Sequence, residues 1–402
     1  MQKGMIYPVQ QNEIVDLLSG LIATKSINPP GNEEIAARIL SEFFKMAGLK
    51  PAFDYVEKER PNILCKVPGK SHEKSFLLTS HLDVVPPGDL SLWNHDPFEA
   101  SVAEGKIYGR GACDAKGSVA AMAAALVALS AIADELNGDV LFLGVAGEEK
   151  GGVGSKKAIT TELRADATIV GEPTNLNIAI GQKGRLGIKI EVLAESSHPA
   201  CSGENMNSIT SMMKVVSFIE NYLVQKMTVD SNESGFLVIN GIHAGEPGVL
   251  SAPNKCSLDL SLWFPSEETH ETAIENFDNY VKTLARRNNI NLKIYYHKGA
   301  SSYLIPETEH IVQLAGKIIK QVRGSEPEIQ KSYASCDMYI FGSAGIPTII
   351  CGPGDLRMAH SANEYVQIEE VLTASRIYFE IARNFLQGNQ VSSKSDLLMG
   401  RR

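Results

Sequence analysis

The chain has 402 residues, which is too long for one ordinary hydrophobic core, so we expect two domains. Apolar residues make up 44% of the sequence, as in a globular protein, and the net charge of −9, without a notable basic cluster, argues against nucleic acid and anionic membranes as partners. The first five residues lack an apolar signal core, and six scattered cysteines without a CxxC spacing predict reduced thiols in a cytoplasm.

The N-terminal part of the chain alternates patterns that are typical of helices and strands. Apolar residues recur at helical spacing from Ile35 to Phe44, and Asn32 can cap this helix while Gly48 can end it. The longest apolar stretch, Val119 to Ala133, is rich in alanine and too short to span a bilayer, so we interpret it as a buried helix. The alternation of helix and strand continues to about Gly184.

Acidic or imidazole side chains follow several apolar runs that are typical of buried strands. The runs are 76–78, 140–145, 167–170 and 348–350, and the side chains that follow them are His81 with Asp83, Glu148 with Glu149, Glu172, and His360. Ligands bind outside the carboxyl ends of the strands in open α/β sheets, so we expect these groups to share one crevice. Carboxylates gathered there would repel one another, and two divalent cations would relieve that repulsion.

The spacing within these groups indicates their chemistry. His81 and Asp83 face the same side of a strand, about 7 Å apart along it, so the carboxylate can hold the imidazole in one tautomer while the other ring nitrogen binds a metal. Glu148 and Glu149 are neighbours and point in different directions. One of the two can bind a metal while the other reaches over the water at that metal and acts as the base for amide hydrolysis.

Asp114 follows a glycine-rich segment, 109–111, and stands just before the alanine-rich helix. Its carboxylate has two oxygens and could bridge two metals. It could also cap the helix, and both roles can hold together. Cys113 beside it is interpreted as a small residue that fills space, because no second thiol is placed to join it as a metal ligand.

The pattern changes at Leu186. It predicts strands at 186–193, 236–243, 255–264 and 291–297 and helices at 205–224 and 268–285. This is the β-α-β-β-α-β order of a ferredoxin-like domain. The earlier pattern resumes at about Ser301, with a helix at 311–322, a strand at 346–351 and a final helix at 368–386. We therefore predict a discontinuous α/β domain, 1–184 with 298–402, into which a smaller α+β domain, 185–297, is inserted.

The motifs, in order and spacing, resemble those of the M20 metallopeptidase family, in the branch of acetylornithine deacetylase and succinyl-diaminopimelate desuccinylase. The matching residues are His81-x-Asp83, Gly109-Arg110-Gly111-x-x-Asp114-x-Lys116-Gly117, Gly147-Glu148-Glu149, Gly171-Glu172-Pro173-Thr174 and His360. The resemblance covers nearly the whole chain. It implies a catalytic domain like that of dizinc aminopeptidases, with an inserted ferredoxin-like lid that also forms a dimer.

The resemblance also implies a set of metal ligands. Asp114 would bridge two zinc ions. His81 and Glu172 would complete the ligands of one ion, and Glu149 and His360 those of the other. Nitrogen and oxygen ligands of this kind also suit cobalt and manganese.

Three further residues receive catalytic roles from the resemblance. Glu148 would be the general base, and Asp83 would orient His81. His198 resembles the lid histidine that reaches into the site of the partner subunit and stabilises the oxyanion.

The inserted domain departs from the family pattern in three places. Pro199 directly follows His198, where the family often has intervening residues. The stretch 259–265 lacks the arginine that holds the carboxylate of the substrate in many members, and the asparagine often found before the preceding strand is missing around 250–253. The acyl group and the amine of the substrate therefore do not transfer from the named enzymes.

We predict a cytoplasmic, homodimeric dizinc hydrolase that removes the acyl group from an N-acyl amino acid or a related amine. One alternative is a dipeptidase or carboxypeptidase of the same family, with the same metals and a different pocket. A second alternative is a catalytically silent metal-binding scaffold, which the presence of Glu148 and a complete set of ligands disfavours. The expected partner is a small molecule and a second copy of the chain.

Overall fold

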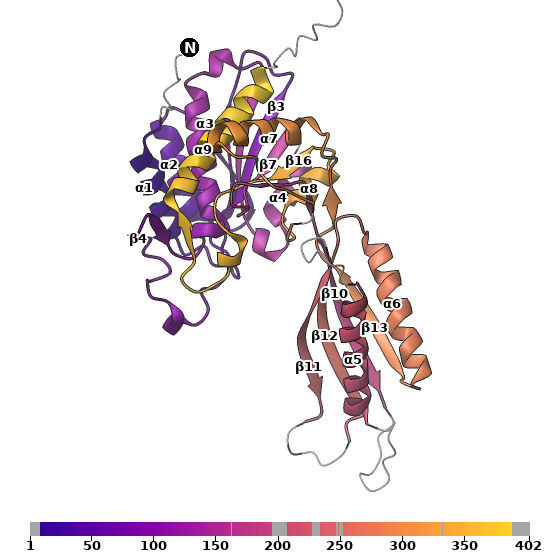
Figure 1. The fold of residues 1–402 in the computed structure, drawn as a ribbon. Coiled ribbons are helices and arrows are strands. Elements are labelled where there is room, and N and C mark those ends of the chain that lie inside the picture. The colour runs from indigo at the N-terminus through magenta and orange to yellow at the C-terminus, as the bar shows by residue number, and fades with distance from the viewer. Residues whose placement is uncertain are drawn as a thin grey trace, which may run out of the picture. The chain divides into compact units, whose positions relative to one another are not determined.

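A computed structural model of the chain describes residues 9–161, 163–194, 207–226, 234–246, 248, 252–331 and 333–387. The chain divides into two compact units, drawn in Figure 1. The first comprises residues 1–178, 307–328 and 344–402, and the second comprises residues 179–306 and 329–343.

The first unit is built on a sheet whose central strands are parallel. Its strands lie in the order β1 (Ala52–Glu57), β2 (Arg60–Val67), β6 (Asp139–Val145), β3 (Ser75–His81), β7 (Ala167–Val170) and β16 (Thr348–Ile350), and the short strand β8 (Ile178–Ala179), which begins at the last residue of segment 1–178, follows. Strands β6, β3, β7 and β16 are mutually parallel, while β1 and β2 form an antiparallel hairpin at one edge. The carboxyl ends of the four parallel strands therefore meet at one edge, as the sequence predicts.

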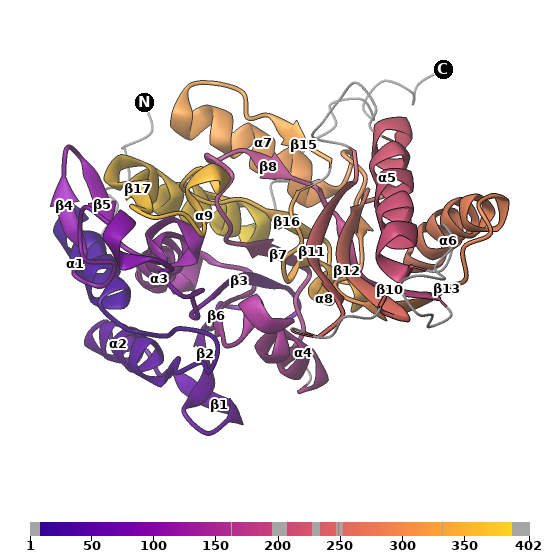
Figure 2. The ribbon, with the colours of Figure 1, turned by 90° about the horizontal axis from the view of Figure 1, so that it is seen from below.

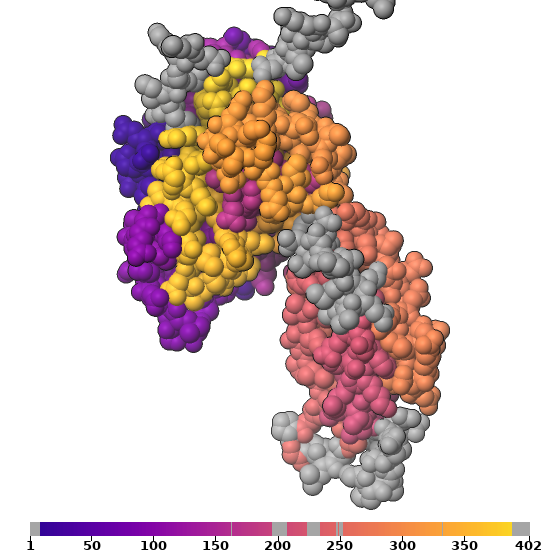
Figure 3. Space-filling view, in the orientation of Figure 1, coloured from indigo at the N-terminus to yellow at the C-terminus, as the bar shows by residue number. Residues whose placement is uncertain are grey.

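Helices cover both faces of this sheet. They are α1 (Gln11–Ile22), α2 (Glu34–Met46), α3 (Gly117–Ser130), α4 (Val153–Thr160), α7 (His310–Arg323) and α9 (Ile368–Gln387). Figure 2 shows α3 and α9 on one side of the sheet and α4 on the other. Helix α7 packs against α9, and the two lie side by side in orange and yellow in Figure 3.

Helix α3 is the central helix of the first unit. It packs against α9 and against strands β3 and β6, and its apolar side chains are almost all buried. The segment Ala112–Ser130 is long and apolar enough to cross a membrane by composition, but 89% of it is buried inside the protein. The apolar character of this segment is thus accounted for by its place in the core, and the predicted buried helix is confirmed.

A small antiparallel sheet joins two distant parts of the chain. Strand β5 (Lys106–Tyr108) pairs with β4 (Ser101–Ala103) on one side and with β17 (Tyr365–Gln367) on the other. Because β5 leads into the segment that carries Asp114, and β17 follows the loop that carries His360, this pairing brings the two segments together.

The second unit contains the predicted ferredoxin-like arrangement. Its elements are β10 (Gly184–Leu193), α5 (Ser208–Lys226), β11 (Phe236–Ala244), β12 (Lys255–Phe264), α6 (His270–Arg287) and β13 (Leu292–Lys298). The antiparallel sheet has the order β11-β12-β10-β13, and alternate residues of β10 and β12 pack against α5 and α6 in one apolar core. The short elements β9 (Gly181–Gln182), β14 (Tyr303–Leu304), β15 (Ile329–Gln330) and α8 (Met338–Ser343) also belong to this unit.

Candidate metal centre

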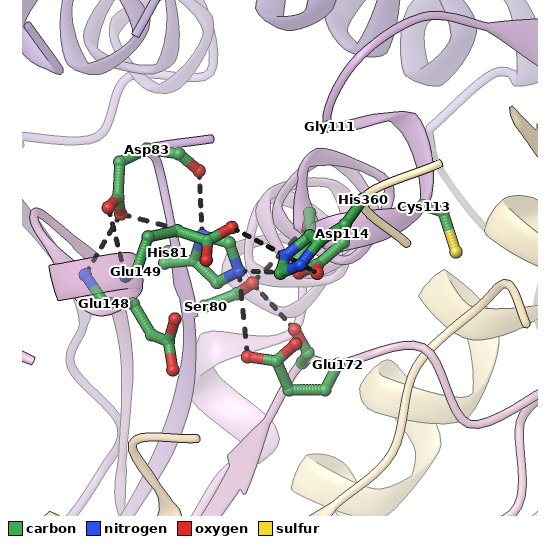
Figure 4. A network of polar contacts seen from close by, with 12 residues as sticks. Ser80, His81, Asp83, Gly111, Cys113, Asp114, Glu148, Glu149, Glu172 and His360 are labelled. Atoms are coloured by element: carbon green, nitrogen blue, oxygen red, sulfur yellow. Dashed lines mark hydrogen bonds and ion pairs between the residues drawn. The ribbon is translucent and has the colours of Figure 1, made fainter. Parts of the chain in front are cut away.

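His81 is the last residue of β3 and is almost fully buried. Its Nε2 atom lies 2.9 Å from Oδ1 of Asp114 and 3.8 Å from Oε1 of Glu172. Its Nδ1 atom lies 2.9 Å from the main-chain oxygen of Asp83 and 3.6 Å from the carboxylate oxygen of the same residue. The ring is therefore held from behind, chiefly by the main chain of Asp83, with Nε2 facing two carboxylates (Figure 4).

His360 supplies a second imidazole on the other side of Asp114. Its Nε2 atom lies 3.2 Å from Oδ2 of Asp114 and 3.2 Å from Oε1 of Glu149. The two oxygens of the Asp114 carboxylate thus face two different histidines. The structure groups His81 with Glu172 on one side of Asp114 and His360 with Glu149 on the other.

The Asp83 carboxylate organises the turn that follows β6. Its oxygens accept hydrogen bonds from the main-chain N–H groups of Gly147 (3.1 Å), Glu148 (3.1 Å) and Glu149 (3.2 Å) and from Nδ2 of Asn28 (2.8 Å). A carboxylate with this many donors is held firmly as an anion, and it fixes the main chain on which both glutamates stand.

The turn itself depends on a glycine. Gly147 has a φ of 75°, and a Cβ atom there would lie 2.5 Å from Val153 and 2.8 Å from the guanidinium of Arg60. Arg60 is buried and forms an ion pair with buried Glu33 at 3.0 Å. With this packing behind the turn, the side chains of Glu148 and Glu149 leave it in different directions, as Figure 4 shows.

The carboxylates give the site a strong affinity for positive charge. Asp114 and Glu149 raise the pKa of His360 to about 10. Burial opposes protonation of His81, but the charges of Glu172 and Asp114 raise its pKa well above the usual range. Burial likewise opposes ionisation of Asp114, yet its hydrogen bonds with His360 and His81 keep its pKa below the usual range.

This donor set suits divalent cations. Ligand atoms of His81, Asp114 and Glu149 all lie within 4.8 Å of one another, and Glu172 and His360 stand on either side. Imidazole nitrogens and carboxylate oxygens without thiolates are the ligands that zinc, cobalt and manganese accept in hydrolases. The residues present therefore fit a metal centre.

Two expectations near Asp114 are resolved by the structure. Asp114 does not cap the alanine-rich helix, because α3 begins at Gly117 and its N-cap residue is Lys116. That alternative is wrong, since the carboxylate is engaged by the two histidines. The thiol of Cys113 is buried and donates to the main-chain oxygen of Asp355 at 3.3 Å, and Figure 4 shows it apart from the ligands. His198 lies outside the described residues.

The sequence did not point to two other residues that hold the site. Asn28 donates to Asp83, and buried Glu364 accepts hydrogen bonds from the main chain on either side of Asp114. Neither follows a strand of the main sheet directly, which is the signal that identified the other residues. The one sequence feature near Glu364 is its position four residues after His360.

An α/β fold with histidines and carboxylates gathered at the carboxyl ends of parallel strands is an arrangement typical of a metal-dependent enzyme. Residues 77–384 match the model of Peptidase family M20/M25/M40. The chain belongs to this family, and it is a metal-dependent hydrolase that acts on amide bonds.

Several proteins resemble the chain over nearly its whole length. It is 26% identical to an N-formyl-4-amino-5-aminomethyl-2-methylpyrimidine deformylase of Halalkalibacterium halodurans, covering 90% of this chain and 92% of the relative. It is 27% identical to a succinyl-diaminopimelate desuccinylase of Rickettsia bellii, covering 95% and 98%. The crystal structure of a tripeptidase from Staphylococcus aureus has the same fold, with a TM-score of 0.77, 20% identity and coverage of 94% and 99%.

Proposed function

We propose that the protein hydrolyses the amide bond of an N-acyl amino acid or a related N-acyl amine at a centre of two divalent cations. The observation that carries this proposal is the placement of Asp114, whose two carboxylate oxygens face His81 at 2.9 Å and His360 at 3.2 Å. A carboxylate between two imidazoles, each with a further carboxylate beside it, is the arrangement that a shared bridging ligand requires.

The proposed ligands follow the grouping around Asp114. His81 and Glu172 would hold one ion, Glu149 and His360 the other, and Asp114 both. Zinc is the metal that we propose, with cobalt or manganese as substitutes for the same nitrogen and oxygen donors. When bound, the two cations would polarise the carbonyl group of the substrate and make water more acidic.

The side chains of the protein would then transfer one proton from water to the leaving group. Water attacks the carbonyl carbon, and we assign to the Glu148 carboxylate the transfer of its proton to the leaving nitrogen, so that the products are a carboxylic acid and a free amine. Asp83 would keep the turn of Glu148 in place through the three main-chain N–H groups that it accepts. It would also keep His81 in one orientation through its main-chain oxygen.

The inserted domain bears on the choice of substrate. The stretch 259–265 in and after β12 contains no arginine to hold a substrate carboxylate. One similar protein is a deformylase of an aminopyrimidine, and another is a desuccinylase of an amino acid. We therefore include amines without a carboxylate among the proposed substrates. Dipeptides remain the alternative, because the same centre would cleave a peptide bond.

A screen of purified, zinc-loaded or cobalt-loaded protein tests the proposal. The panel contains N-acetyl, N-succinyl and N-formyl amines, with and without a carboxylate, together with dipeptides, and the release of free amine is measured. We expect turnover of N-acyl amines and a loss of at least about 10²-fold in Glu148→Gln with metal retained. Glu149→Gln should instead weaken the binding of one of the two ions. An active, metal-replete Glu148→Gln would overturn the assigned base, and a preference for dipeptides would select the alternative.

Outside the centre, we propose a homodimer through the second unit. Strand β11 is an edge of its sheet, and its side chains Val238, Ile239 and Ile242 are between 42% and 51% exposed. A long apolar edge strand is a surface that proteins normally cover. Residues 185–297 would then serve as both lid and dimerisation domain, and His198 would reach the site of the partner and stabilise the oxyanion.

We also propose a cytoplasmic location. The cysteines within the described residues are all free and buried, which suits a reducing compartment. The net charge of −9 continues to argue against nucleic acid and anionic membrane as partners.

A further inference from the structure

One buried carboxylate, that of Glu364, joins the two segments that carry Asp114 and His360. Glu364 stands four residues after His360 and its side chain is fully buried. Its Oε1 atom accepts hydrogen bonds from the main-chain N–H groups of Gly111 (3.1 Å), Cys113 (2.9 Å) and Asp114 (3.0 Å). The carboxylate thus fixes the turn that aims Asp114.

The second oxygen of Glu364 extends this connection to the His360 loop. Oε2 forms an ion pair with Arg110, whose guanidinium is also buried. The same guanidinium donates to the main-chain oxygen of His360 at 3.3 Å. The main-chain oxygen of Glu364 accepts a hydrogen bond from Gly109 at 2.9 Å. A chain of contacts from Asp114 through Glu364 and Arg110 therefore reaches His360.

We propose that Glu364 is a positioning residue for the metal centre, which sets the separation between Asp114 and His360 and so the affinity of the site that these two share. This inference rests on the proposed dinuclear centre. Glu364 touches neither histidine ring nor the Asp114 carboxylate in any contact described above. It acts through the main chain on one side and through Arg110 on the other.

The groups around the Glu364 carboxylate predict the effect of two substitutions. Every group that the Glu364 carboxylate meets is a donor: three main-chain N–H groups on Oε1 and the guanidinium on Oε2. In Glu364→Gln, the amide NH₂ would have to face donors whichever way it is turned, so one of the two segments would lose its partner. Glu364→Asp keeps both acceptor oxygens but draws them back by one methylene group.

Glu370 provides a matched control. It accepts a hydrogen bond from the main-chain N–H of Gly354 at 2.7 Å, in the loop that follows β16. Glu370→Gln removes the same charge from the same part of the first unit and from a carboxylate with the same kind of partner. Gly354 lies in the same loop as His360, six residues before it, so Glu370→Gln tests whether the loss of any carboxylate that holds this loop is enough to weaken the metal site.

The experiment measures zinc stoichiometry and affinity by calorimetry and metal analysis, and the absorption spectrum of the cobalt-loaded protein, beside circular dichroism. We expect wild type and Glu370→Gln to bind two ions. Glu364→Gln should keep its secondary structure but bind the second ion 10- to 100-fold more weakly, about the usual effect of residues that support metal ligands, and shift the cobalt spectrum. The affinity of Glu364→Asp for the second ion should lie between those of wild type and Glu364→Gln.

The outcomes separate this inference from the proposed function. If wild type and Glu364→Gln bind two ions with equal affinity and equal cobalt spectra, the positioning role is wrong while the dinuclear centre stands. If wild type itself binds no metal, the proposed function fails and the inference fails with it. Loss of secondary structure in both Glu364 variants would assign the residue to the stability of the core and would overturn the role proposed for it.

Discussion

Asp83 shows how a single side chain can serve two parts of an active site. Its main-chain oxygen holds the His81 ring at 2.9 Å, while its carboxylate accepts hydrogen bonds from the main chain of the turn that follows β6. The proposed ligand and the proposed base are thereby fixed relative to one another by one residue. Substitution of Asp83 should therefore lower both the metal affinity and the turnover rate.

Asp83→Asn tests this dual role. The amide that replaces one carboxylate oxygen would face N–H donors from Asn28 or from the Gly147–Glu149 turn. We expect metal affinity and kcat each to fall by about 10- to 100-fold and the free energy of unfolding to fall by about 1–3 kcal/mol, since buried donors lose their acceptor. Asp166→Asn is the control, because Asp166 is exposed and accepts from Ser75 at the opposite end of β3. A variant in which either metal affinity or kcat is unchanged would contradict the dual role.

At this scale, the sequence predicts the residues that follow strands and misses those that support them. His81, Glu149 and Glu172 are recognisable because each stands just after an apolar run. Glu364 gives no such signal, because its partners are main-chain N–H groups about 250 positions earlier in the chain. Main-chain N–H donors do not depend on residue type, so the amino-acid sequence does not indicate this contact.

At the scale of elements, α2 illustrates how one helix face fixes the sheet beneath it. Phe44 on α2 is fully buried, and its ring meets that of Phe142 on β6 edge to face, with centroids 5.2 Å apart. Met46, two residues further along the same helix, is 88% exposed. The pair offers a buried and an exposed apolar residue within one turn.

Phe44→Ala should destabilise the first unit by about 3–5 kcal/mol, because it removes a large buried ring and leaves a cavity beside Phe142. Met46→Ala should change stability by less than about 0.5 kcal/mol. Urea unfolding of both variants, followed by circular dichroism, provides the measurement. Equal effects of the two substitutions would show that the contact between α2 and β6 contributes little.

The inserted elements are predicted closely because their patterns are strong. The predicted strand 255–264 coincides with β12, and the predicted helix 268–285 differs from α6 by two residues at each end. Alternating apolar residues on β10 and β12 face one core, so each strand can be recognised by itself. In contrast, the short strands β5 and β17 are stabilised by each other across more than 250 residues, and neither has a pattern long enough to predict it.

Local signals were less accurate at the ends of elements. The sequence predicts that Asn32 caps α2, but the N-cap residue is Glu33, without a side-chain cap. Glu33 is instead drawn into the buried ion pair with Arg60. A tertiary contact has thus taken precedence over a capping preference, which sequence alone could not foresee.

At the scale of the whole molecule, each active site of the proposed dimer would contain residues from both subunits. We expect a mixture of inactive Glu148→Gln and inactive His198→Ala to regain part of the wild-type activity when subunits exchange. One of the two sites in the mixed dimer then combines an intact base with an intact histidine from its partner. Turnover is measured before and after exchange, together with molar mass by light scattering.

The edge strand supplies the control for this mixing test. Ile242→Lys, placed in both variants, adds a charge to exposed β11 and should give monomers and no recovery. Val102→Lys, at a position that is 57% exposed on β4 of the first unit, should leave recovery unchanged. No recovery despite demonstrated exchange would show that His198 does not act in the partner's site.

The order in which the chain is synthesised has a consequence for the metal centre. The proposed ligands run from His81 to His360, and the whole of the second unit, residues 179–306 and 329–343, is made between them. The contact between Arg110 and Glu364 closes a loop of 254 residues. Contacts of such long range form late in folding, because chain entropy must be lost before they contribute. Metal loading should therefore be among the last events in folding. Because the metal binds only after the ligands have come together, binding shifts the equilibrium toward the folded first unit by mass action.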